Sequence, residues 1–282
     1  RRVVVPGMFP HGVAARLQKK GVRVTVAKAP LFPERAVKRP DELRQIKESQ
    51  QAAVIAMRAA IHRIAETEIA PNGYLVLKGR KVTAEEVRRV ITRVLVDHDC
   101  FSEETIVAGG KQAVDPHEVG AGPLRAHEAI VIDIFPRHLR HGYWGDLTRT
   151  VVRGQAPASL RTMYQAVKAA QTAALNRVRA GARTDRVHRA AVAEFEKSGF
   201  KTEVEAGKGS GFVHSTGHGV GLAIHEAPSL GMAKGRLKSG MAVTIEPGLY
   251  YPGIGGIRIE DTVVVTPTGW RYLVPCEKKF EV

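Results

Sequence analysis

The chain has 282 residues, of which 44 % are hydrophobic and 25 % are charged, and its formal net charge is +15. This composition is typical of one large globular domain, alone or with a smaller piece, and it excludes a disordered chain. No apolar run is long enough to span a bilayer, so we expect no membrane partner. The basic clusters, such as Arg137–His141, are short and lack interleaved aromatic residues, which disfavours nucleic acid as a partner.

The first 39 residues predict a strand at 3–5, a helix through Val13 and Leu17, and a strand at Val22–Val26. Three prolines, at 30, 33 and 40, then indicate a linker. The sequence begins Arg1-Arg2 rather than with methionine. We therefore expect residues 1–39 to be the remnant of an amino-terminal domain plus a linker, and residues 40–282 to form the main domain.

Four helices are predicted in the main domain. The first begins at Asp41 and runs to Pro71-Asn72-Gly73, and the second follows a capping-box pattern formed by Thr83 and Glu86. The others cover about 157–179 and the residues from Thr184 or Asp185 to near Gly199.

Strands are predicted at Thr105–Ala108, Ala129–Phe135, Gly142–Val152, Ala242–Glu246 and Gly256–Val265. The order of two helices followed by strands therefore occurs twice. This order predicts an α+β fold with an internal pseudo-duplication of a helix-helix-strand unit, although the two halves share no evident sequence identity.

Histidines gather in the stretch 212–228, where His214, His218 and His225 fall within twelve residues. Glycines at 217, 219 and 221 surround His218 and allow close backbone approach. Histidine is the commonest metal ligand and can move protons near neutral pH. The stretch therefore predicts a metal or catalytic site.

Four acidic residues lie inside or at the ends of the apolar strands: Asp133, Asp146, Glu246 and Glu260. A carboxylate in such a place is costly unless a cation compensates it. Four carboxylates with one imidazole match a pair of hard or borderline divalent ions. Asp133 and Asp146 are symmetric about the Leu139–Arg140 bond, so we expect them to face each other across a hairpin.

The chain resembles the pita-bread metallopeptidases, and most closely their Xaa-Pro peptidase branch, which includes prolidase and aminopeptidase P. The resemblance covers about residues 40 to 275. It rests on Asp133 with Gly142-Tyr-Trp-Gly-Asp146-Leu-Thr-Arg-Thr150, His214-x3-His218-Gly-Val-Gly-Leu-x2-His225-Glu-x-Pro228, Thr244-Ile-Glu246-Pro-Gly, and Gly256-Ile-Arg-Ile-Glu260-Asp.

The resemblance implies a peptidase that cleaves between an N-terminal residue and proline, using two divalent ions (Mn, Co, Zn or Fe, with Mn favoured). Asp133 would bind the first ion, and Asp146 and Glu260 would bridge both. His218 and Glu246 would bind the second, and a hydroxide between the ions would attack the peptide carbonyl. The remaining roles would be Glu246 as general base and acid, His225 as the group that steadies the tetrahedral intermediate, and His117, His214, His225 and Arg258 as substrate contacts, with His117 also catalytic.

The sequence departs from the family pattern around the first aspartate. Phe135 stands where the family usually has glycine, and the loop Pro136–His141 lengthens the Asp133–Asp146 interval. These differences leave the substrate range open. The alternatives are an aminopeptidase of other specificity, a creatinase-like hydrolase, or a non-catalytic module that binds peptides or nucleic acid.

The setting of the protein is also predicted. Two cysteines, Cys100 and Cys276, provide no disulfide framework, so we expect a reducing, cytoplasmic compartment. The resemblance implies a peptide substrate with proline at the second position, and a homodimer.

Overall fold

The computed structural model describes residues 1–28, 30–205 and 208–282. It divides into two compact units, Arg1–Arg35 and Ala36–Val282. The boundary lies slightly before the predicted one at residue 39. The interpretation of the first unit as the remnant of an amino-terminal domain stays a prediction.

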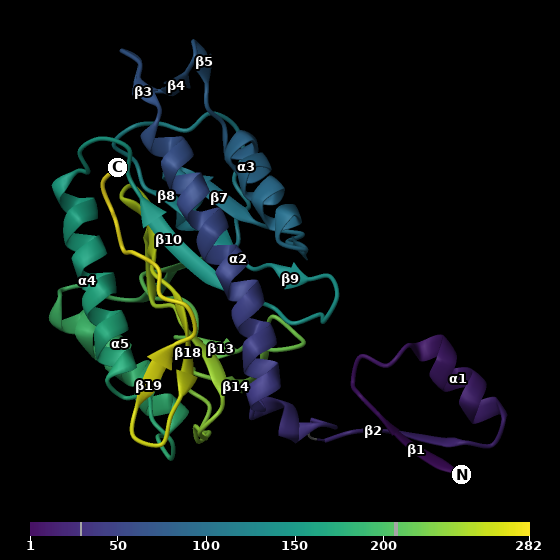
Figure 1. Cartoon of the computed structure of the whole chain (residues 1–282). Helices are drawn as coiled ribbons and strands as arrows, with labels where there is room; N and C mark the ends of the chain where they lie inside the picture. The colour runs from purple at the N-terminus through teal and green to yellow at the C-terminus, as the bar shows by residue number, and fades with distance from the viewer. Residues whose placement is uncertain (29, 206–207) are drawn as a thin grey trace. The chain divides into compact units, whose positions relative to one another are not determined.

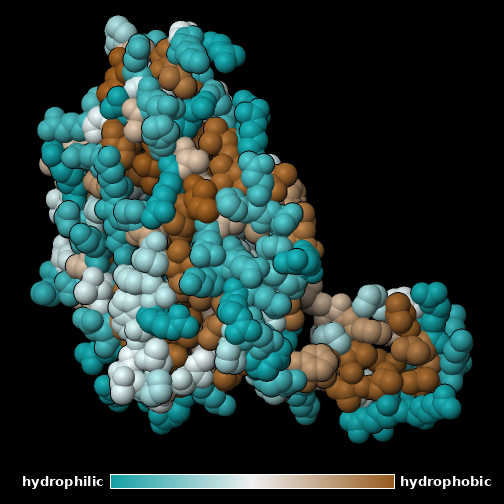
Figure 2. Space-filling view, viewed as in Figure 1, coloured by the Kyte–Doolittle hydropathy of each residue, from teal (hydrophilic) through white to brown (hydrophobic). Residues whose placement is uncertain are grey.

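The smaller unit is a strand, a helix and a strand, as the sequence predicts. β1 (Arg2–Val5) pairs in parallel with β2 (Arg23–Val26), and α1 (His11–Lys19) connects them. Figure 2 shows hydrophobic residues over much of the visible face of this unit. Large hydrophobic side chains that stay exposed within it include Val4, Met8, Val26 and Phe32. This small unit therefore covers little of its own apolar surface. A short 3₁₀ helix, η1 (Pro33–Ala36), spans the boundary.

The first half of the larger unit contains two helices and a three-stranded sheet. The helices are α2 (Pro40–Ala65) and α3 (Ala84–Asp97), and the sheet has the order β10-β8-β7. Figure 1 shows α2 running along β8 and β10. The other elements are β3 (Glu68–Ile69), β4 (Leu75–Leu77), β5 (Arg80–Lys81), β6 (Cys100–Phe101), β7 (Ile106–Gly109), η2 (Gly110–Val114), β8 (Ile130–Ile134), β9 (Arg137–His138) and β10 (Leu147–Val151).

Helix α2 ends earlier than the sequence predicts. The predicted end was Pro71-Asn72-Gly73, but the helix stops at Ala65. Thr67 closes it, because its backbone N–H and its hydroxyl both donate to the Ile64 carbonyl, at 3.2 and 2.7 Å. The following residues form the small antiparallel sheet β3-β4-β5.

The second half repeats this plan. The helices are α4 (Ala158–Leu175) and α5 (Thr184–Lys197), and the main sheet has the order β14-β13-β15-β18-β19. The strands are β11 (Glu203–Glu205), β12 (Lys208–Ser210), β13 (His218–Gly219), β14 (Glu226–Ser229), β15 (Ala242–Ile245), β16 (Gly248–Tyr251), β17 (Gly255–Arg258), β18 (Asp261–Val265) and β19 (Trp270–Tyr272). The predicted strand 256–265 is thus two strands, which separate at Ile259-Glu260.

Each pair of helices covers its own sheet with a hydrophobic core. In the first half, Met57, Ile91 and Ile132 belong to one buried cluster, and in the second half, Met163, Phe195 and Ile245 belong to another. The predicted α+β fold with a repeated helix-helix-strand unit is therefore confirmed. Within the described residues, no helix has the length and apolar character needed to cross a membrane.

The pairing of β8 with β10 corrects one expectation. Asp133 lies opposite Thr148, not opposite Asp146. Gly142 closes the turn at φ +76°, and its N–H donates a hydrogen bond to the His138 carbonyl at 2.9 Å. The hairpin is therefore centred one residue later than predicted. The pairing shifts by two residues. An even shift keeps Asp146 on the same face as Thr148, and therefore on the side of Asp133.

Candidate active site

One cavity of about 720 Å³ gathers every site residue that the sequence singled out. The nine predicted site residues, which all line it, are His117, Asp133, Asp146, His214, His218, His225, Glu246, Arg258 and Glu260. They come from both halves of the larger unit. The repeated fold thus brings distant parts of the sequence to one place.

The metal-ligand candidates lie in or beside the central strands. Asp133 is in β8, Asp146 directly precedes β10, and His218 opens β13. Glu246 directly follows β15, and Glu260 stands between β17 and β18. Strand ends are held by the sheet on one side, so these side chains are fixed before any ligand binds.

Backbone contact explains the glycine before His218. A Cβ added to Gly217 would lie 2.0 Å from the Thr244 carbonyl oxygen, which is far below a possible contact distance. Thr244 Oγ1 accepts the His218 backbone N–H at 3.0 Å and donates to Glu246 at 3.1 Å. The glycine therefore allows the histidine segment to lie directly against the strand that carries Glu246.

His218 is oriented as a metal ligand. Its Nδ1 lies 3.1 Å from the Gly219 carbonyl, which places the ring proton on Nδ1 and leaves the Nε2 lone pair free. Nε2 lies 3.5 Å from Asp146 Oδ2 and 3.2 Å from Glu246 Oε1. Asp146, His218 and Glu260 each offer a ligand atom, and these atoms all lie within 4.8 Å of one another.

The crowded carboxylates need positive charge. Burial raises the pKa of Asp146 well above its usual range, and the charges of Glu260, Asp133 and Glu246 add to this rise. Burial and the Glu246 charge likewise raise the pKa of Glu260. Among the described buried side chains, Asp133 Oδ1 stands without a hydrogen-bond partner. A donor set of four carboxylates and one imidazole, with an unpartnered oxygen, fits divalent metal ions.

A second group of polar side chains surrounds this set. Arg258 Nη2 donates to Asp133 Oδ2 at 2.7 Å, and Nη1 donates to the Tyr250 hydroxyl at 2.8 Å. The Tyr250 hydroxyl lies 3.0 Å from His214 Nε2, while His214 Nδ1 lies 2.8 Å from the Ser215 carbonyl. Burial lowers the pKa of His214 to about 4. His214 is therefore neutral at neutral pH, with Nε2 accepting the tyrosine proton.

The two remaining histidines, His225 and His117, also line the cavity. The His225 ring meets the His218 ring edge-on, with centroids 4.2 Å apart, and burial together with His218 lowers its pKa. His117 follows η2, and its backbone N–H bonds Asp115 Oδ1 at 2.9 Å. Apolar residues complete the wall: Ile106, Val119, Phe135 and Ile224.

Four residues that hold the site were not singled out from the sequence. The Tyr250 hydroxyl accepts a hydrogen bond from Arg258. The Thr148 hydroxyl donates to Glu260, and the Thr244 hydroxyl donates to Glu246. Gln50 in α2 exchanges two 2.8 Å hydrogen bonds with the Asp146 backbone. Thr148 and Thr244 lie within the quoted motifs, two residues from a predicted ligand, which is the same-face spacing of a strand. Gln50 gives no signal, because it reaches the site only through the packing of α2.

Comparison with known proteins identifies the family. The profile of metallopeptidase family M24 matches residues 44–267. The chain belongs to this family. Among the most similar M24 relatives, the Xaa-Pro dipeptidase of Pyrococcus furiosus is 32 % identical over 247 residues, which cover 87 % of this chain and 65 % of the relative. The Xaa-Pro dipeptidase of Pyrococcus horikoshii is 31 % identical over 282 residues, covering 98 % of this chain and 73 % of the relative.

Solved structures agree with the M24 assignment. The prolidase from Pyrococcus furiosus superposes with a TM-score of 0.85 at 28 % identity, covering 99 % of this chain and 77 % of that one. An Xaa-Pro dipeptidase from Bacillus anthracis gives 0.84 at 27 % identity, covering 100 % and 75 %. The predicted pita-bread fold is therefore confirmed. The chain spans about two thirds to three quarters of the length of these relatives.

Proposed function

We propose that this chain is a metal-dependent peptidase that hydrolyses the bond between an N-terminal residue and a following proline. The observation that carries the proposal is the convergence of all nine predicted site residues on one cavity of about 720 Å³. Family membership and relatives named Xaa-Pro dipeptidase support it. The complete set of acids disfavours the alternative of a metal-free binding module.

Five residues would hold two divalent ions. Asp133 would bind one, His218 and Glu246 would bind the other, and Asp146 and Glu260 would bridge them. When bound, such ions lower the pKa of water and stabilise negative charge on a carbonyl oxygen. The donor set accepts Mn, Co, Zn or Fe, and we propose Mn as the native ion. The oxygen atoms outnumber the single imidazole nitrogen, which suits a hard cation.

The remaining chemistry falls to residues of the chain. Glu246 lines the cavity and would act as general base, because its carboxylate can take a proton from the attacking water. It then returns that proton to the leaving proline nitrogen. His225, neutral and beside His218, donates a hydrogen bond to the developing oxyanion. This role requires its ring proton on the nitrogen that faces the substrate.

Substrate binding would use other residues of the same cavity. His117, His214 and Arg258 provide polar groups for the ends and carbonyls of a short peptide. The apolar side chains of Ile106, Val119 and Phe135 offer contact area to a proline ring, which has no N–H to satisfy. We also propose a homodimer, following the family resemblance.

The decisive experiment is hydrolysis of an Xaa-Pro dipeptide and of a longer Xaa-Pro-Xaa peptide after chelation, with Mn²⁺, Co²⁺ or Zn²⁺ restored. Activity should return with metal and vanish in Asp146→Asn, while the control Asp97→Asn, at an exposed position of α3, should keep full activity. The preferred peptide length assigns the subtype. Restored metal without cleavage of either peptide would refute the proline specificity, and failure to bind metal would refute the peptidase.

A further inference from the structure

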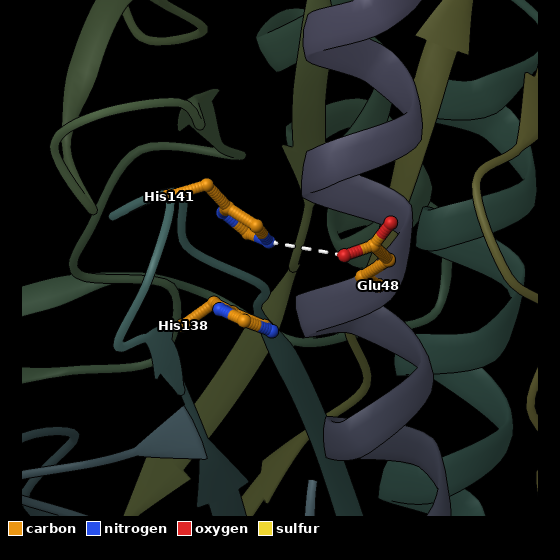
Figure 3. Close-up of side chains that lie close together, drawn as sticks. All are labelled: Glu48, His138 and His141. Carbon is orange, nitrogen blue, oxygen red and sulfur yellow. Dashed lines mark ion pairs between the residues drawn. The ribbon is translucent and has the colours of Figure 1, made fainter. Parts of the chain in front are cut away.

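A second cluster of metal-ligating side chains lies outside the cavity. Glu48 in α2, His138 in β9 and His141 in the following turn each offer a ligand atom, and these atoms all lie within 4.8 Å of one another. Figure 3 shows Glu48 projecting from the helix toward the two imidazole rings. None of these three side chains is among the described residues that line the active-site cavity. The cluster therefore needs an explanation of its own.

His141 carries an unpartnered nitrogen. Its side chain is 8 % exposed, and its Nε2 lies 3.3 Å from Glu48 Oε2, yet Nε2 makes no hydrogen bond among the described residues. The two atoms are close enough for an ion pair, but the orientation of the imidazole ring toward Glu48 does not suit a hydrogen bond. An edge of about 3.3 Å is what two ligands make around a tetrahedral ion with bonds of about 2.0–2.1 Å. The separation therefore suits a shared metal ion.

The cluster is held in place by its surroundings. The His138 and His141 rings stack with centroids 3.9 Å apart, and His138 is buried in β9, paired with Cys100. The Leu139 N–H bonds the Asp99 carbonyl at 2.8 Å. These contacts fix the loop against Asp99 and β6 before any ion arrives. An ion bound by both imidazoles lies close to the plane of each ring, so the two stacked rings must rotate away from parallel when it binds.

Solvent can reach the cluster. Glu48 and His138 line a separate cavity of about 630 Å³, together with Asp97, His98 and Asp99. The Glu48 side chain is half exposed. A water molecule from this cavity can complete the coordination of an ion held by three protein ligands.

We propose that Glu48, His138 and His141 bind one borderline divalent cation, of which Zn²⁺ is the best fit, and thereby clamp the 136–141 loop to helix α2. Two nitrogens and one carboxylate oxygen suit zinc better than magnesium or calcium. This site is additional to the two ions of the proposed active site.

The protons of the two rings can be accounted for. Nδ1 of His138 accepts the Arg140 N–H, and Nδ1 of His141 accepts the Tyr143 N–H, each at 3.2 Å. These bonds place the ring protons on Nε2 in the metal-free chain. To bind an ion through Nε2, each ring moves its proton to Nδ1, where it would face the backbone N–H that Nδ1 had accepted, so each ring must also turn away from that N–H. The cost is two long backbone hydrogen bonds and the rotation of both rings, and three bonds to zinc stand against it.

The clamp would act on the active site through α2. Glu48 lies two residues before Gln50, which holds the Asp146 backbone by two hydrogen bonds of 2.8 Å. The loop itself joins Asp133 to Asp146 along the chain. An ion at this place therefore fixes the hairpin that carries two of the proposed active-site ligands, without touching the substrate.

The test uses the full chain and zinc alone. The background variant Asp146→Asn/Glu260→Gln weakens the proposed active-site centre, and zinc bound per chain is measured by equilibrium dialysis at micromolar Zn²⁺. We expect one ion per chain in this background, and none after His141→Ala or Glu48→Gln is added. The control His62→Ala removes an exposed histidine of the same helix and should leave that ion bound.

A second measurement protects the test against misfolding. In the chain with an intact active site, the His141→Ala variant should bind one zinc ion fewer than the unsubstituted protein. Zinc should therefore raise its melting temperature by less, while its circular dichroism spectrum stays unchanged. Equal zinc binding with and without His141 would overturn the proposal. So would a folded background variant that binds no zinc. The peptidase is judged separately, by hydrolysis of Xaa-Pro peptides.

Discussion

Arg149 Nη2 lies 2.7 Å from Asp261 Oδ1, and both side chains are only 1 % exposed. The pair joins β10 of the first half to β18 of the second. Arg149 also donates to four backbone carbonyls, those of Thr148, Glu260, Cys276 and Glu277. Two of these carbonyls belong to residues that shape the active site, so this buried cation holds the halves together beside the proposed metal centre.

Replacing Arg149 with methionine should destabilise the protein by about 3 kcal/mol, because four backbone carbonyls lose a donor and Asp261 keeps only Lys278 as a cationic partner. Arg149→Lys should rescue little, since an ammonium group cannot reproduce the planar fork of the guanidinium. Urea denaturation of both variants measures the change in the free energy of unfolding.

The matched control for this prediction is Arg58→Met. Arg58 pairs with Glu277 at 2.7 Å, but the two side chains are 54 % and 67 % exposed. Such a surface pair contributes about 0–1 kcal/mol. Similar losses in the Arg149 and Arg58 variants would contradict the role assigned to burial.

Tyr250→Phe tests the group around the proposed metal ligands. The substitution keeps the ring and removes the hydroxyl that links Arg258 to His214. Because Arg258 in turn orients Asp133, we expect metal affinity or kcat/KM to fall roughly 10–100-fold. Tyr251→Phe is the control, since the Tyr251 hydroxyl bonds the Lys201 carbonyl instead. Unchanged kinetics and metal affinity in Tyr250→Phe would remove the tyrosine from the site.

The sequence could predict the elements and the candidate ligands, because both depend on local patterns. Asp133 and Glu246 stand out as acids at apolar strands, and the turn glycines and caps mark the helices. What the sequence could not supply was register and packing. The hairpin shift depends on where Gly142 closes the turn, and Gln50 meets Asp146 only after α2 has packed on the sheet. Such contacts come from tertiary structure and leave no periodic signal.

Gly217→Ala should damage the site through the backbone. The new methyl group would lie 2.0 Å from the Thr244 carbonyl oxygen, so the histidine segment must move away from β15. We expect a loss of about 1–3 kcal/mol or more in stability, with weaker metal binding, because His218 is the next residue. Gly231→Ala is the control, since its methyl group would meet Ser215 Cβ at an ordinary 3.4 Å. Chemical denaturation and metal titration compare the two, and equal behaviour would contradict the argument.

His188 makes the stability depend on pH. Its ring is buried beside Phe212, its Nδ1 lies 2.9 Å from Thr216 Oγ1, and burial, with a smaller contribution from Arg189, lowers its pKa. In the unfolded chain a histidine has a pKa of about 6.5, so as pH falls the unfolded state binds the proton first. The contribution of His188 is therefore present above that pKa and is lost as pH falls toward the lower folded value.

His188→Gln, which keeps a polar group near Thr216, should flatten the decrease in unfolding free energy between about pH 7.5 and 5.5. Urea denaturation in the presence of a chelator measures it, with exposed His62→Gln as the control. Parallel pH curves for the His188 variant and the unsubstituted protein would show that the buried ring does not resist protonation.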